Sequence, residues 1–98
     1  MSSRVVVRPQ AEAELLAARD WYDAQRTGRG QQFVDEVGEA MRAVATRPLS
    51  FPKVHGEVRR TILRRFPYGV FFRTTEAEVI ILGIVHGRRH PRLWRSRQ

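Results

Sequence analysis

The sequence predicts an α+β domain with the element order β-α-α-β-β-β, in which a helical hairpin packs on one face of a small twisted sheet. Three observations support this fold class. Apolar residues recur at helical spacing up to about residue 46, apolar and polar residues alternate after residue 57, and a segment rich in proline and glycine separates the two regions. With 98 residues the chain is long enough for one hydrophobic core, so we expect a single domain over residues 1–98.

The N-terminal half is expected to form a strand followed by two helices. The run from Arg4 to Arg8 holds three consecutive valines and is stopped by Pro9, which suits the first turn of a helix. The first helix should extend to about residue 24, with an apolar stripe of Ala11, Leu15, Ala18 and Tyr22 that is widened by Leu16 and Trp21. We expect Trp21 and Tyr22 to serve in the core and in helix packing.

A second helix should follow the turn Thr27–Gly30 as the other arm of an antiparallel hairpin. Its apolar positions are Phe33, Val37, Ala40, Met41 and Val44, and it should end before Pro48.

Residues 48–56 contain two prolines and a glycine and are expected to be a loop. The next strand should place Val58, Ile62 and Phe66 on one face. Its many arginines are typical of a strand at the border of a sheet. Residues 68–74 and 79–86 should complete an antiparallel meander. The last of these strands is apolar on both faces, so we expect it to be central, with the first strand beside it in parallel.

Charge divides the chain into two unlike halves. Residues 1–50 hold seven arginines and seven acidic residues, whereas residues 51–98 hold eleven Lys or Arg and three acidic residues, which accounts for the net charge of +8. A one-sided positive field attracts nucleic acid or an acidic protein segment. The basic tail at about residues 87–98, which contains HGRRHPRLWRSR, is expected to take part in such binding.

Composition excludes several kinds of site. The chain has no cysteine, which rules out disulfides and thiolate metal sites and favours a cytoplasmic protein. No signal peptide is visible and the longest apolar run, residues 79–85, is too short to cross a bilayer. We expect no membrane association, no metal site and no cofactor.

Several segments together resemble the ParE/RelE superfamily of toxins from type II toxin–antitoxin, or plasmid stabilisation, systems. They are DWYDAQ, GQQFVDEV, RPLSFP, VRRTILRRFPYGVFFR and VIILGIVHGRRHPRLW, and the likeness runs from Val5 to Trp94. The pair RRFPYGVFFR and EVIILGIVHGRRHP is similar to the ParE-like branch. The resemblance implies a cognate antitoxin, ParD-like or similar, that carries an acidic segment, and two toxins held by an antitoxin dimer. It also implies one of two targets, which are DNA gyrase for ParE-like members and mRNA on the ribosome for RelE-like members.

The RelE-like alternative requires a catalytic set that this chain matches only in part. That branch has an arginine where residues 67–71 read PYGVF, and a C-terminal tyrosine or histidine. Metal-independent RNA cleavage needs a base, a cation at the phosphate and an acid. The available candidates are Glu57, His86, Arg88, Arg89 and His90. Simpler roles are a solvated ion pair for Glu57 and a loop position for His90. For His86 the simpler role is a hydrogen-bonded, partly buried position on the side of Ile80, Leu82 and Ile84.

We therefore expect a ParE-like toxin that acts by binding, with DNA gyrase as its target and an antitoxin as its inhibitor. An mRNA interferase and a plain basic nucleic-acid-binding module are the alternatives. Arg88 and Arg89 are the expected key residues. The other residues expected to contact the target or the antitoxin are Arg59, Arg60, Arg64, Arg65, Arg73, Arg92, Trp94 and Arg95. Trp94 either folds back on the sheet or docks to a partner.

Overall fold

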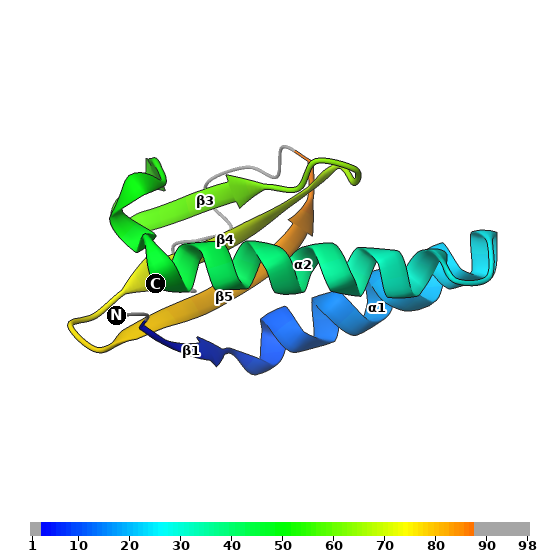
Figure 1. Ribbon diagram of the computed structural model, residues 1–98, viewed down its shortest axis with the longest axis horizontal. Helices are drawn as coiled ribbons and strands as arrows, with labels where there is room; N and C mark the ends of the chain where they lie inside the picture. Colours follow the sequence, from blue (N-terminus) through cyan, green and yellow to red (C-terminus); the bar gives the residue numbers. More distant parts are fainter. Residues whose placement is uncertain (1–2, 88–98) are drawn as a thin grey trace.

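A computed structural model describes residues 3–87 of the chain. Two long helices lie on one face of a five-stranded sheet (Figure 1). The elements in chain order are β1 (Arg4–Val7), α1 (Pro9–Gln25), α2 (Arg29–Thr46), the short 3-10 helix η1 (Pro48–Ser50), β2 (Lys53–His55), β3 (Val58–Ile62), β4 (Tyr68–Thr74) and β5 (Glu78–His86).

The strand order β1-β5-β4-β3-β2 confirms the predicted topology. β1 runs parallel to β5, with Arg4 opposite Glu78 and Val7 opposite Ile81, and the helical hairpin lies in the crossover between them. The strands β3, β4 and β5 form the expected antiparallel meander. The predicted class, a helical hairpin on a small mixed sheet, is therefore confirmed.

The turn between the helices is held by one carboxylate. Asp23 Oδ1 accepts the backbone N–H of Gly28 at 2.9 Å and that of Gly30 at 3.2 Å. Gly28 has a φ of 90°, a left-handed conformation that glycine adopts without steric cost. Because α2 begins at Arg29, these bonds satisfy N–H groups at a helix start that have no partner within the helix.

The sheet is apolar on both faces. A helix-side cluster joins the helices to the sheet through buried residues that include Phe33, Val37, Phe72 and Ile81. A far-side cluster on the opposite face contains Val58, Phe71, Ile80, Leu82 and Val85. The prediction that residues 79–86 form a central strand buried on both faces is confirmed.

Aromatic rings concentrate where the helical hairpin meets the β3–β4 turn. The fully buried Phe33 ring has its centroid 5.4 Å from Tyr22, 5.1 Å from Phe66 and 5.0 Å from Tyr68. Arg29 places its guanidinium carbon 4.2 Å from the centroid of the Phe66 ring. Such contacts contribute beyond the area that they bury. Burial raises the pKa of Tyr22 and the neighbouring Tyr68 acts in the same direction, so the Tyr22 hydroxyl stays protonated at neutral pH.

Two sequence predictions about residues 48–66 are wrong. The expected loop contains η1 and the three-residue strand β2, which pairs with β3 through Lys53 opposite Arg59 and His55 opposite Val58. β2 therefore forms the border of the sheet at the start of β3. A three-residue strand is too short to show an alternating pattern, and it is stabilised by its partner.

β3 also ends earlier than predicted. The strand stops at Ile62 and the chain turns, so Phe66 does not share a face with Val58. Val58 belongs to the far-side cluster, Phe66 to the helix-side cluster, and Ile62 is 53% exposed.

The predicted orientation of His86 is wrong because β5 contains a bulge. Phe71 lies opposite Gly83 and Phe72 opposite Ile81, which leaves one residue of β5 extra. A bulge reverses the alternation of side chains along a strand. Ile84 consequently packs in the helix-side cluster, whereas Leu82 lies with Ile80 on the far side. His86 lies two residues beyond Ile84 and is exposed rather than partly buried.

Trp21 also differs from its predicted role in the core. Its neighbour Tyr22 packs in the helix-side cluster as expected, but the Trp21 side chain is 59% exposed. Leu16, which was expected to widen the apolar stripe, is 39% exposed.

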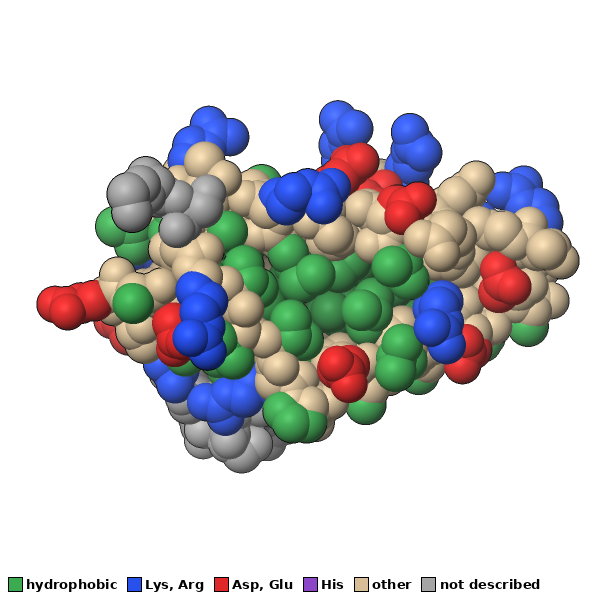
Figure 2. Space-filling model, turned by 60° about the horizontal axis from the view of Figure 1, so that its bottom comes forward, with side chains coloured by type: hydrophobic (Ala, Val, Ile, Leu, Met, Phe, Trp, Pro, Cys, Tyr) green, Lys and Arg blue, Asp and Glu red, His purple; other side chains and the backbone are tan. Residues whose placement is uncertain are grey.

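Figure 2 shows a central hydrophobic patch on the side that it views, with acidic and basic side chains interspersed around it.

Candidate functional site

The structure separates the two described residues of the nuclease alternative. Glu57 immediately precedes β3, at the end of the sheet where β5 begins, and its carboxylate pairs with Lys53 at 3.1 Å. His86 ends β5 opposite Tyr68, at the other end of the sheet. The predicted ion pair of Glu57 is confirmed. Glu57 and His86 cannot act on one substrate bond, and the remaining candidates, Arg88, Arg89 and His90, lie outside the described residues.

Two of the arginines that were expected to bind a partner lie on the far side of the sheet. Arg60 is opposite Phe71 and Arg73 is opposite Ile80, and both of these apolar residues belong to the far-side cluster. Within residues 3–87, Arg73 Nε is buried without a hydrogen-bond partner.

Arg59 has an internal role. Its Nη1 donates to the carbonyl oxygen of Phe51 at 2.6 Å, which ties the segment after η1 to β3. The other expected contact residues, Arg92, Trp94 and Arg95, lie outside the described residues together with Arg88 and Arg89.

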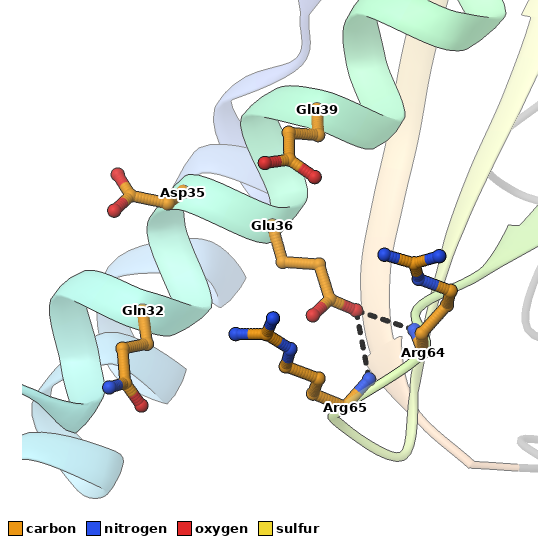
Figure 3. A pocket seen from close by; sticks show the side chains of 6 residues that line it. All are labelled: Gln32, Asp35, Glu36, Glu39, Arg64 and Arg65. Carbon is orange, nitrogen blue, oxygen red and sulfur yellow. Dashed lines mark hydrogen bonds between the residues drawn. The ribbon is translucent and has the colours of Figure 1, made fainter.

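Arg64 and Arg65 occupy the β3–β4 turn and face helix α2 (Figure 3). Glu36 Oε2 accepts the backbone N–H of Arg65 at 3.0 Å and also that of Arg64, so this carboxylate fixes the turn. Both arginine side chains are exposed, and neither forms an ion pair within residues 3–87. A cavity of about 230 Å³ lies between the turn and the helix, lined by Gln32, Asp35, Glu36, Glu39, Arg64 and Arg65.

A second hollow continues the first along α2. It measures about 280 Å³, and most of its additional lining is apolar, from Ala40 and Ala43 on α2 and from Ile62 and Leu63 at the end of β3. The two hollows share Glu36, Glu39 and Arg64. We call them together the α2–β3 trough. It has an apolar floor, and its walls carry both the guanidinium groups of Arg64 and Arg65 and the carboxylates of Asp35, Glu36 and Glu39.

Removing the carboxylate that holds the turn should destabilise the fold moderately. We expect Glu36→Ala to lower the free energy of unfolding by about 1–2 kcal/mol, because two backbone N–H groups lose a charged acceptor and water replaces it only in part. Urea unfolding would measure the change. Glu39→Ala is the matched control, since Glu39 lies one turn further along α2 and forms no hydrogen bond or ion pair within residues 3–87. Equal effects of the two variants would show that Glu36 does not fix the turn.

A separate hollow of about 270 Å³ lies between α1 and the end of β5. Glu14 Oε1 accepts the N–H of Ile84 at 3.0 Å, beyond the point where β1 stops pairing with β5. Trp21 and His86 are among the residues that line this hollow. The His86 ring packs edge-on against the Tyr68 ring, with the two centroids 5.3 Å apart. Sequence reasoning missed this grouping because the bulge in β5 decides on which face His86 lies.

Two further kinds of site can be assessed within residues 3–87. No group of three or more His, Cys, Asp or Glu side chains in this part is placed to hold a metal ion. Of the described helices, none is long and apolar enough to span a membrane.

Comparisons with known proteins agree with the fold. No curated protein gives a significant match to the chain. A solved structure described as the chromosomal ParDE toxin–antitoxin system from P. aeruginosa is similar with a TM-score of 0.78 and 22% sequence identity, covering 88% of this chain and 97% of that chain. The family described as the ParE toxin of the type II toxin–antitoxin system parDE matches residues 5–91. Since that match takes in every helix and strand of the structure except the first residue of β1, the chain belongs to the ParE toxin family of type II toxin–antitoxin systems.

Proposed function

We propose that this toxin acts by binding a macromolecular target, DNA gyrase, and that it is neutralised by a cognate acidic antitoxin. The observation that carries the binding mode is the arrangement of charged groups. Arg64 and Arg65 present exposed guanidinium groups that form no ion pair within residues 3–87, whereas Glu57 and His86 lie at opposite ends of the sheet. Guanidinium groups bind carboxylate and phosphate without any need for an acid–base pair.

The partners follow from family membership and from charge. ParE toxins belong to two-component systems, so we propose a ParD-like antitoxin and a hetero-oligomeric complex with it in the cytoplasm. The net charge of +8 favours an acidic segment as the inhibitor. The proposal of DNA gyrase as the target rests on the resemblance to ParE-like toxins.

A supercoiling assay with purified gyrase tests the proposal. We expect the toxin to inhibit supercoiling and to trap cleaved DNA, and we expect the purified antitoxin to reverse both effects. His86→Ala should retain the inhibition to within about twofold, because an exposed ring on the protein surface contributes little to the fold. Absence of inhibition at a large molar excess of toxin would exclude gyrase as the target.

One observation supports the alternative function, that of an mRNA interferase. His86 is exposed and its ring lies beside that of Tyr68, so an imidazole and a phenol meet at one end of the sheet. Toeprinting on translated message distinguishes the two functions. Codon-specific cleavage by the wild-type toxin that disappears in His86→Ala would favour the interferase over the gyrase inhibitor.

A further inference from the structure

We propose that the C-terminal segment, residues 88–98, lies across the far side of the sheet and covers the far-side cluster, with Trp94 as its main apolar contact. This contact forms within the free toxin. It goes beyond the proposed function because it requires neither the antitoxin nor gyrase, and it decides whether Trp94 folds back on the sheet or docks to a partner.

The far-side cluster is more deeply buried than the strands that form it can explain. Its members all come from strands, and within residues 3–87 the two long helices lie on the opposite face (Figure 1). Yet Val58 is 0% exposed, Leu82 1% and Phe71 3%. A polar atom on this side, Nε of Arg73, is buried as well. A sheet face in contact with water keeps part of its side chains exposed, so a further layer of chain must cover this one.

Two stretches of the chain lie outside residues 3–87, and one of them begins on the other side of the sheet. Residues 1–2 lead into Ser3, whose N–H donates to the carbonyl oxygen of Ala45 on α2 at 2.8 Å. Residues 88–98 follow Gly87, which is two residues beyond Val85 of the far-side cluster. The C-terminal segment is therefore the part of the chain that is placed to cover the far side.

The C-terminal segment is also long enough to cross the cluster. The cluster runs diagonally from Val85 near the end of β5, over β4, to Val58 at the start of β3. This diagonal spans roughly 15–20 Å, at about 3.3 Å per residue along a strand and about 4.8 Å between strands. Trp94 follows Gly87 by seven residues, which reach about 23 Å when extended. Ile62, at the end of β3 and off this diagonal, is 53% exposed, as expected if the segment passes it by.

The composition of the segment suits an apolar sheet face that borders on water. Leu93 and Trp94 are its large apolar side chains, and the far-side cluster removes them from water. Its five arginines can lay their methylene groups on the sheet and keep their guanidinium groups in solvent. This placement brings arginines that were expected to bind the target to the side of the sheet that carries Arg60 and Arg73.

Nuclear Overhauser effects in the wild-type toxin test the contact directly. The indole protons of Trp94 should show them to methyl groups of the far-side cluster, such as those of Val58 and Leu82. Val37 and Val44 on the helix side are 0% exposed like Val58 and serve as controls, for which we expect no effect from Trp94. Contacts of Trp94 with these two valines, or with neither cluster, would overturn the proposal.

Mixing labelled and unlabelled toxin distinguishes a contact within one chain from a contact with a second copy. We expect the Overhauser effects to persist when isotope-labelled toxin is diluted into unlabelled toxin, because they arise within one molecule. Effects that appear only between a labelled and an unlabelled chain would mean that a second copy covers the far side, and the proposal would be wrong.

Tryptophan fluorescence gives an independent measurement on the full-length chain. In Trp21→Phe the remaining tryptophan is Trp94, and its emission should lie at shorter wavelength in the folded protein than in urea, because the ring is out of water. Trp94→Phe is the matched variant. It keeps Trp21, whose 59% exposure predicts a smaller shift between the same two states. An emission of Trp94 that is the same in the folded protein as in urea would contradict the proposal.

Truncating the contact should lower the midpoint of thermal unfolding. We expect Trp94→Ala to lower it by about 8 °C or more, because a large side chain packed on an apolar face is lost. The neighbouring Arg95→Ala should lower it by about 3 °C or less, since a guanidinium group in water contributes little. Equal midpoints of Trp94→Ala and the wild type would show that Trp94 stays in solvent. These measurements use neither gyrase nor antitoxin, so their failure would leave the proposed function standing.

Discussion

Gly30→Ala should destabilise the protein by about 2–3 kcal/mol, even though alanine is the better helix former. A Cβ atom at Gly30 would lie 2.5 Å from the backbone oxygen of Arg19 and 3.0 Å from the Cβ of Asp23. The oxygen belongs to the backbone of α1, so the clash can be relieved only by moving the helices apart. Urea unfolding at neutral pH would measure the loss.

Gly38→Ala in the same helix is the control for this prediction. Among residues 3–87, and apart from the nearby backbone of α2 itself, the only atom within 4 Å of the added Cβ is Nη1 of Arg42, at the flexible end of a side chain and 3.6 Å away. We expect a gain of about 0.5–1 kcal/mol from the lower conformational entropy of the unfolded chain. If both glycines tolerated alanine equally, the close approach of α1 and α2 at Gly30 would not be a constraint on the fold.

Phe33→Ala should cost about 3–5 kcal/mol, the largest effect that we expect from a single side chain. Phe33 is fully buried and touches three other aromatic rings, which hold α1, α2 and the β3–β4 turn together. A domain of this size is stabilised by only about 5–15 kcal/mol in total, so the variant should be unfolded in part near body temperature. Thermal and urea unfolding, monitored by circular dichroism, would determine the loss.

Trp21→Ala provides the comparison with Phe33→Ala. Trp21 is the larger side chain, but it is 59% exposed, and its one ring contact within residues 3–87 is with Tyr22, at 5.0 Å between ring centroids. We expect a loss of about 1 kcal/mol or less from this truncation. A loss for Trp21 as large as that for Phe33 would mean that α1 packs in a different orientation.

Local patterns predicted most of the architecture because periodicity reports which face of an element is buried. The spacing of Phe33, Val37 and Val44 predicted α2 correctly, and all three residues are fully buried. The apolar run of β5 predicted a strand buried on both faces, and this is what the structure contains. Pro9 correctly indicated the start of α1.

Predictions that depended on distant parts of the chain were less accurate. β2 exists only because β3 lies beside it, and its three residues carry no alternation that could be recognised. The side on which His86 lies depends on the bulge at Leu82 and Gly83, which is visible only from the pairing with β4. For the candidate site, the sequence drew attention to Arg64 and Arg65. It gave no sign that Glu36, 28 residues earlier than Arg64, would hold their backbone N–H groups and form the wall of a trough.

The sequence by itself determined the kind of protein, a basic α+β domain of the ParE toxin family, because composition, periodicity and family pattern are properties of the chain read in order. Only the tertiary structure decided which charged groups are free to bind. It directs the guanidinium of Arg59 to a carbonyl oxygen and leaves those of Arg64 and Arg65 exposed. The reason is that a side chain is available to a partner only after the backbone and the neighbouring groups have taken their own hydrogen bonds, and these bonds connect residues far apart in the sequence.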